Sequence, residues 1–276
     1  MQKDAESLKY VNQSGFPLQI AIERLFEDEL AGGDWCVSHS EHAWANRRNQ
    51  QSGFIDLVIC NRAQTIFLVV ECKRRLSTSW LFMHSDGTAN AVTRTKTWVS
   101  QFDPRKHAGN YSHLGWFDIQ ADPASPVAMF CCTRGQTDKD KVNMLERDCS
   151  ELISSTEALA IEEKKFGSSN VKPLRLYLNV IVTTAELKVT EFDPYGISLD
   201  DGTIREAKFT SVPYLRFRKQ FSGQPNFLYD GLITIENPES ATERENTVFI
   251  VRANQFVNFL RAFDVRGESL RQFDLA

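Results

Sequence analysis

The sequence lacks most of the patterns that assign a protein to a class at first inspection. Its six cysteines form no C-x-x-C pair, and it contains no Walker loop, no G-x-G-x-x-G and no G-x-S-x-G. A zinc or disulfide framework, a nucleoside triphosphatase and a serine hydrolase therefore have no support. Fourteen glycines and nine prolines in 276 residues are too few for a fibrous or low-complexity chain. We expect an ordinary folded protein with reduced, mostly buried thiols.

Long apolar runs and an excess of basic residues are missing too. The longest apolar runs, such as residues 66–70, are far shorter than the ~20 residues of a membrane-spanning helix. Residues 1–6 are polar and mixed in charge, unlike a secretory signal, so we expect no membrane contact and a cytoplasmic location. Lys and Arg total 32 against 36 Asp and Glu, a formal charge of -4. Nucleic acid would therefore have to be bound by a local basic patch rather than by overall charge.

Hydrophobic periodicity and turn residues predict the order of helices and strands. The predicted helices cover 17–31, 91–102, 138–166 and 254–263, and the predicted strands cover 34–38, 54–60, 65–73, 127–132, 174–183 and 248–251. This order favours an α/β fold in which a mixed central sheet is flanked by helices on both faces. After residue 184 the apolar segments become short and alternating. We therefore expect a core over 1–185 and a β-rich extension over 186–276, whose final strand and helix pack on the core.

Three charged side chains interrupt two neighbouring apolar strands. Asp56 lies in the first strand, and Glu71 and Lys73 lie at the end of the second. Side chains alternate across a strand, so Glu71 and Lys73 share one face. If the hairpin turns at residues 62–63, Asp56 lies opposite Val69 and diagonal to Glu71, close enough for both carboxylates to reach one cation. All three charged groups then project from one side of the sheet.

Such a cluster has a chemical use. Buried neighbouring carboxylates raise each other's pKa unless a cation joins them. Carboxylate oxygens suit Mg²⁺ or Mn²⁺, and such an ion polarises a phosphodiester and lowers the pKa of a bound water. Lys73 would orient the attacking hydroxide or neutralise charge in the transition state. The residues alone also allow an edge-strand salt bridge, because E-x-K occurs by chance in many proteins.

At these residues the sequence resembles the PD-(D/E)XK nuclease superfamily. Asp56 matches the first acid of the motif, Glu71 and Lys73 match its E-x-K on the following strand, and Ile55 stands where the motif has proline. The resemblance covers roughly residues 14–185 in architecture but only a handful of residues in identity. It implies a restriction-endonuclease-like fold, that is, a mixed central sheet flanked by helices, and a nuclease that depends on Mg²⁺ or Mn²⁺.

The resemblance also implies roles for particular residues. The metal ligands would be Asp56, Glu71 and the carbonyl of Cys72, and Lys73 would position the attacking water. Glu23 on the first helix and Gln101 after E-C-K match further positions of some members. The substrate would be DNA, cleaved in restriction, repair or defence. The sequence does not distinguish DNA from RNA, and only paired cuts in a duplex would suggest a homodimer.

As a group, the basic residues near the motif are candidates for phosphate contacts, although scattered surface charge explains any single one of them better. They are Arg47, Arg48, Arg74, Arg75, Arg94 and Lys96. Residues 214–219 interleave aromatic and cationic side chains, which fits a strand-binding face or an amphipathic sheet edge. Two alternatives to a nuclease remain: a binding module for nucleic acid or protein that does not cleave, and a structural domain in which E-C-K is incidental.

Overall fold

The computed structural model describes residues 2–46, 50–75, 78–102, 111–133, 144–163, 174–221 and 244–273. The fold is mostly β, with 49% strand against 27% helix.

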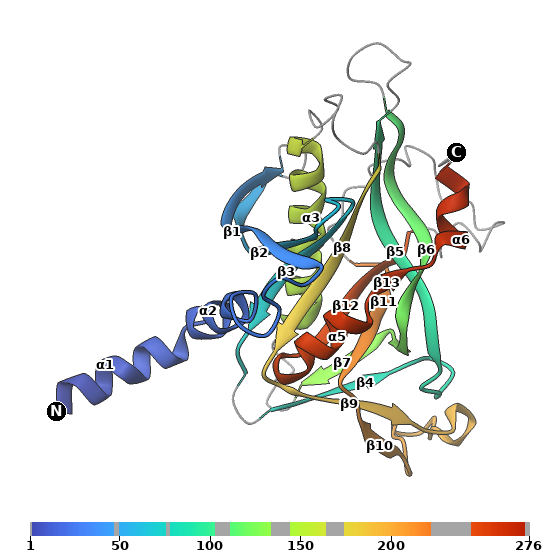
Figure 1. Cartoon of the computed structure of the whole chain (residues 1–276). Helices are drawn as coiled ribbons and strands as arrows, with labels where there is room; N and C mark the ends of the chain where they lie inside the picture. Colours follow the sequence, from blue (N-terminus) through green and yellow to red (C-terminus); the bar gives the residue numbers. More distant parts are fainter. Residues whose placement is uncertain are drawn as a thin grey trace.

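Five strands close into a barrel (Figure 1). They are β5 (Ala91–Phe102), β6 (Tyr111–Ala128), β8 (Leu174–Thr183), β11 (Tyr214–Lys219) and β12 (Asn246–Arg252). β8 pairs with β12, β12 with β11, β11 with β6, β6 with β5, and β5 again with β8. The circuit closes because β8 pairs with β5 over residues 174–177 and with β12 over residues 179–183.

This barrel shows that the expected restriction-endonuclease-like sheet flanked by helices is wrong. The largest local error concerns residues 91–102, which form strand β5 and not a helix. Thr93, Thr95, Thr97 and Val99 place a β-branched side chain at every second position, a pattern that favours a strand. The boundary expected at residue 185 runs through the barrel, because β8 precedes it while β11 and β12 follow it.

Three further strands extend the sheet beyond β8. They are β1 (Trp35–Asn46) at the edge, then β2 (Gln51–Asn61), then β3 (Ile66–Lys73), which pairs in parallel with β8. The strands predicted at 54–60 and 65–73 are confirmed, and β2 and β3 form the predicted antiparallel hairpin. Its loop is held by Asn61, whose Oδ1 accepts hydrogen bonds from the backbone N–H groups of Thr65 (2.9 Å) and Ile66 (3.0 Å).

The pairing of β2 with β3 differs by two residues from the expected register. Val58 lies opposite Val69, and Leu57 lies opposite Val70, where the pairing ends. Asp56 therefore comes level with Glu71 instead of Val69. Ile55 packs in the same apolar cluster as Val58, whereas Leu57 packs in the other cluster, so the regular alternation of side chains is interrupted next to Asp56.

A second sheet holds four short strands in the order β10 (Lys208–Ser211), β9 (Glu186–Glu191), β4 (Ser79–Met83) and β7 (Phe130–Thr133). β4 turns Trp80 and Phe82 into the core. A two-residue strand, β13 (Asp264–Val265), pairs with β6. The strands predicted at 174–183 and 248–251 are confirmed as β8 and β12, and the segment predicted at 127–132 is shared by the end of β6 and by β7.

The helices lie on both sides of the strands that carry the motif. In Figure 1, α1 (Gln2–Gln13) projects away from the body, and α2 (Phe16–Arg24) leads back to it. α3 (Met144–Glu162) lies against β1, β2 and β8, and α5 (Phe256–Ala262) lies against β12 and β6. Short helical segments complete the described chain: η2 (Pro194–Gly196), η3 (Ala253–Gln255), α6 (Gly267–Leu270) and η4 (Arg271–Phe273). None of the described helices is long and apolar enough to cross a membrane.

The predicted helices at 138–166 and 254–263 are confirmed over the spans of α3 and α5. Residues 138–143 and 164–166 lie outside the described part. The helix predicted over 17–31 ends at Arg24, and turns follow it up to Gly32.

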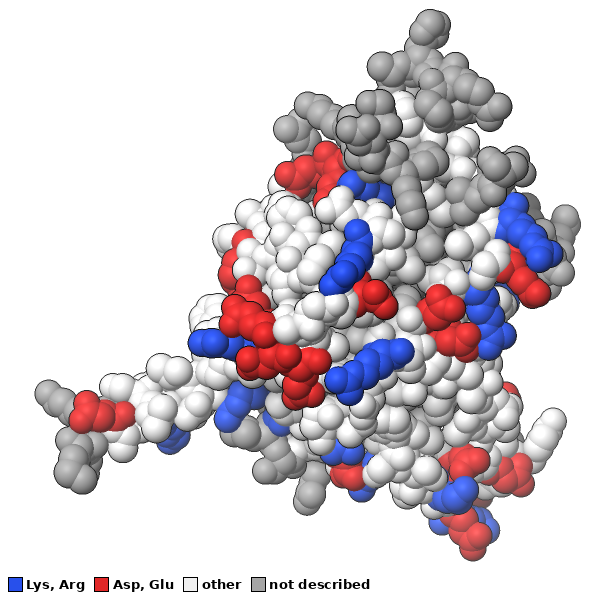
Figure 2. All heavy atoms as spheres, in the orientation of Figure 1, with Lys and Arg blue, Asp and Glu red and all other residues white. Residues whose placement is uncertain are grey.

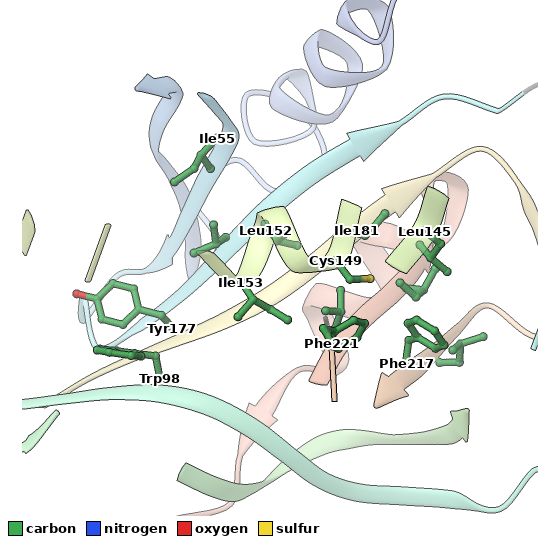
Figure 3. Packing of buried hydrophobic residues seen from close by; sticks show 14 of the residues in the cluster. Ile55, Trp98, Leu145, Cys149, Leu152, Ile153, Tyr177, Ile181, Phe217 and Phe221 are labelled. Carbon is green, nitrogen blue, oxygen red and sulfur yellow. The ribbon is translucent and has the colours of Figure 1, made fainter. Parts of the chain in front are cut away.

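Two apolar clusters cover opposite faces of β3 and β8. One contains Val69 together with Cys149 and Leu152 of α3, and the other contains Val70 together with Leu18 of α2. Figure 3 shows the first cluster, in which α3 packs against strands of the barrel. Because side chains alternate along β3, Glu71 and Lys73 follow Val69 onto the α3 side. The core thus fixes which face carries the charged motif.

Candidate functional site

Glu71 and Lys73 meet an acid from α3 at the end of β3. The Lys73 ammonium lies 2.7 Å from Oε1 of Glu71 and 3.6 Å from Oδ1 of Asp148. The side chains of Glu71 and Lys73 are each 22% exposed, whereas that of Asp148 is only 5% exposed. Lys73 thus bridges two carboxylates from different elements.

Asp56 lies where β2 and β3 separate. Its Oδ2 accepts a hydrogen bond of 2.6 Å from the backbone N–H of Cys72, and its carbonyl accepts one of 3.2 Å from the side chain of Gln19 in α2. The N–H and C=O of an extended residue point to the same side of the strand, so the Cys72 carbonyl also faces away from β8. It lies beside Gly15, where an added Cβ would be 3.7 Å from its oxygen. Asp56 and the Cys72 carbonyl therefore both lie along the edge of β3 that faces away from β8.

The two motif carboxylates repel each other. Burial raises the pKa of Glu71 to about 7, and the negative charge of Asp56 adds to the rise although Lys73 opposes it. Burial also raises the pKa of Asp56, against the lowering effects of the Cys72 N–H and Lys73, and Glu41 of β1 adds to the rise. Ionising both acids together is therefore unfavourable, and an added cation would relieve the repulsion.

Lys73 remains protonated at neutral pH. Burial alone would lower the pKa of Lys73, but the charges of Glu71 and Asp148 more than offset it and the pKa is raised. A lysine with a raised pKa is a fixed positive charge and not a proton acceptor. Lys73 can therefore stabilise negative charge that develops nearby.

Asp148 is the site residue that sequence reasoning missed. Burial raises its pKa, and the guanidinium of Arg75 lies 3.7 Å from Oδ2, an oxygen that accepts no hydrogen bond from the described residues. A signal was present in the sequence, because Asp148 follows Leu145 by three residues and precedes Leu152 by four, on the apolar stripe of the helix. An acid on such a stripe indicates a buried partner.

A pocket of about 420 Å³ opens beside this cluster, between α3 and the start of β2. Glu71, Lys73 and Asp148 line it, together with Trp44 and the 62% exposed ring of Phe54. Its other lining residues are Gln50, Gln51, Ser52, Gly53, Glu151, Leu152 and Ser155. Asp56 lies outside this lining. The pocket combines fixed charges, polar side chains and an exposed aromatic ring.

The two further catalytic candidates lie elsewhere. Gln101 is buried in β5, where its side-chain N–H donates to the carbonyl of Phe273 (2.5 Å) and its Oε1 contacts Nδ1 of His113 (2.7 Å). These contacts give it a structural role outside the pocket lining. Glu23 is half-buried on α2, which packs on the opposite side of β3 from α3. Gln19 is the α2 residue that contacts Asp56.

Few of the expected basic residues are available for phosphate contacts. Lys96 is 3% exposed and pairs with Asp118 (3.2 Å), and Arg94 pairs with the same carboxylate (2.7 Å). Arg75 turns toward Asp148, and Arg74 is half-buried directly after Lys73. Arg47 and Arg48 lie outside the described residues. Figure 2 shows Lys and Arg interspersed with Asp and Glu over the face that it draws.

Residues 214–219 form β11, which pairs on both sides within the barrel. Arg216 is fully buried: it donates to Oγ1 of Thr95 and to the carbonyls of Pro123 (2.9 Å) and Ala121 (2.6 Å), and it stacks on the ring of Phe249. These cations hold the barrel together, so neither the strand-binding face nor the sheet edge describes this segment.

Among the described residues, no three His, Cys, Asp or Glu side chains are arranged to hold a metal ion. A cation would therefore rely on two carboxylates, a backbone carbonyl and water, which is an ordinary set for Mg²⁺. No family model, curated protein or solved structure matches the chain. Only the geometry of the site itself therefore bears on function.

Proposed function

We propose that this protein is a metal-dependent nuclease that hydrolyses phosphodiester bonds of DNA, in restriction, repair or defence. The observation that carries the proposal is the contact of Glu71 with the protonated Lys73 at an open polar pocket, near enough to Asp56 for the negative charge of Asp56 to raise the pKa of Glu71. A structural salt bridge needs one acid and one base. The additional acids and the pocket are the features that such a bridge does not require.

Asp56 and Glu71 would hold a Mg²⁺ or Mn²⁺ ion, with the Cys72 carbonyl as a third oxygen ligand. Their raised pKa values fit this role, because a cation would stabilise both ionised forms at once. Such an ion, when bound, polarises a phosphodiester and lowers the pKa of a coordinated water.

The protein's own groups would complete the site. Lys73, held by Glu71 and Asp148, supplies a fixed positive charge for the negative charge that grows on the phosphate during hydrolysis. The exposed ring of Phe54 at the pocket offers a surface on which a base can stack. Arg74 would contribute positive charge at the same strand end.

A binding module that does not cleave is the second candidate. It is favoured by the short contact between Lys73 and Glu71, since the internal cation already neutralises one carboxylate. The same pocket could then recognise nucleic acid without hydrolysing it. The proposal includes a cytoplasmic location, supported by six cysteines that are all free thiols.

The test is a cleavage assay on the purified protein with supercoiled, linear and single-stranded DNA and with RNA, in Mg²⁺, in Mn²⁺ or in EDTA. Glu71→Gln and Lys73→Met should each lower the cleavage rate on the order of 10²-fold or more. Glu151→Gln is the matched control, because Glu151 is an exposed acid of the same pocket, and it should retain activity.

A parent protein that cleaves none of these substrates would contradict the proposal, and binding without cleavage would favour the module. Cleavage that is equal in the parent, Glu71→Gln and Lys73→Met would place the activity elsewhere.

A further inference from the structure

Two cysteines face each other across the outermost hairpin. Cys36 of β1 lies directly opposite Cys60 of β2, and their Sγ atoms are 3.5 Å apart. Cys36 is exposed on the edge strand, whereas Cys60 is buried. The pair lies at the end of the hairpin away from residues 50–54, which line the pocket.

We propose that Cys36 and Cys60 are an oxidation site that forms a reversible cross-strand disulfide with hydroperoxides. Residues directly opposite in an antiparallel pair have Cα atoms about 4.5 or 5.5 Å apart, within the span of about 4.4–6.8 Å that disulfides bridge. The sulfur atoms would have to approach by roughly 1.5 Å to reach bonding distance. The register shift between Val37 and His39 places an irregularity of β1 next to Cys36, where the edge strand can adjust.

The reaction balances with a hydroperoxide as the oxidant. The thiolate of Cys36 attacks one peroxide oxygen, the O–O bond breaks, and the leaving alkoxide takes a proton to become an alcohol. Cys36 is then a sulfenic acid. The sulfur of Cys60 attacks Sγ of Cys36, the S–O bond breaks, and the departing hydroxide takes the thiol proton of Cys60 to form water. Two thiols are oxidised to one disulfide, and one hydroperoxide is reduced to alcohol and water.

The structure also sets the order of the two steps. Exposure lets the oxidant reach Cys36, while burial raises the pKa of Cys60 to about 12 and keeps that thiol protonated. Cys36 therefore reacts first and Cys60 resolves the intermediate. The product would tie the edge strand to the sheet through residues 36 and 60, enclosing the β2 segment that carries Asp56.

The test treats the folded protein with tert-butyl hydroperoxide, alkylates the remaining thiols under denaturing conditions and counts them by mass spectrometry. The parent should fall from six alkylated thiols to four and return to six after dithiothreitol. Cys36→Ser should keep all five of its thiols. Cys132→Ser, which removes the other exposed cysteine, should fall from five to three.

Peptide mapping should find the cross-link between Cys36 and Cys60. Six thiols in the treated parent, or a cross-link between two molecules or at another pair, would overturn the proposal. Because Cys36 is exposed, the Cys36→Ser variant should fold normally. The circular dichroism spectrum and melting temperature of this variant before oxidation test that expectation. The result does not depend on nuclease activity.

Discussion

Glu71 should make the folded protein less stable as the pH rises through neutrality. Its folded pKa is about 7, against 4.5 for the unperturbed side chain. Between these values the folded chain holds a proton that the unfolded chain has lost, so the free energy of unfolding falls as pH rises through this window. Glu71→Gln cannot ionise and should lack this decline.

The size of the effect follows from the shift. A difference of two to three pKa units corresponds to roughly 3 kcal/mol at about 1.4 kcal/mol per unit. The Glu71 side chain is 22% exposed, so solvent screening removes little of this value. Relative to the parent, Glu71→Gln should gain up to this amount between about pH 4.5 and pH 8. Below that window the two proteins should differ little.

Urea unfolding followed by circular dichroism at a series of pH values measures the effect, with Glu151→Gln as the matched control. A second arm adds Mg²⁺ at pH 8, which should stabilise the parent more than Glu71→Gln, because only the parent offers both carboxylates. The difference in unfolding free energy between parent and Glu71→Gln could instead stay constant from about pH 4 to pH 9. That result would refute the raised pKa of Glu71 and the repulsion between Glu71 and Asp56.

Two further predictions concern charges in the barrel. Burial alone would raise the pKa of Asp118, but hydrogen bonds from Arg218 and Arg94 lower it to about 2. Asp118→Asn should therefore cost about 2 kcal/mol at pH 7, and the contribution should vanish as pH falls from about 4 to 2. The control for this prediction is the exposed Asp86, which lies between β4 and β5 outside the barrel: in urea titrations Asp86→Asn should cost less than about 1 kcal/mol. Arg216→Met should cost about 3 kcal/mol by leaving buried acceptors unpaired; a melting temperature equal to the parent's would contradict this.

Local patterns predicted the strands of the motif well. Apolar residues on β2 and β3, separated by a short polar loop, were enough to identify the hairpin and to place Glu71 and Lys73 on one face, whereas the alternation of side chains is interrupted beside Asp56. The register could not be read, because it depends on how Asn61 holds the loop. The apolar pattern of residues 91–102 predicts a helix, but their alternating β-branched residues favour the strand β5 that the structure has.

The pairing of strands that are far apart in the chain could not be predicted from the sequence. The barrel closes because β8 exchanges one neighbour for another midway along its length, and no local pattern encodes that change. The approach of Asp148 to Lys73 likewise depends on how α3 docks on the sheet. The partner of the buried Lys96 depends on the register of β5 against β6, which places Asp118 directly opposite it.

The most direct measurement is the single-turnover rate at which the parent and Lys73→Met cleave a labelled DNA at saturating Mg²⁺. Lys73 is a fixed cation at the pocket and donates no ligand to the proposed ion, so its loss should slow the bond-breaking step without abolishing metal binding. We predict parent cleavage that EDTA stops and a rate for Lys73→Met that is lower by on the order of 10². Equal rates for the two proteins, or no cleavage by the parent, would contradict the assignment of this site.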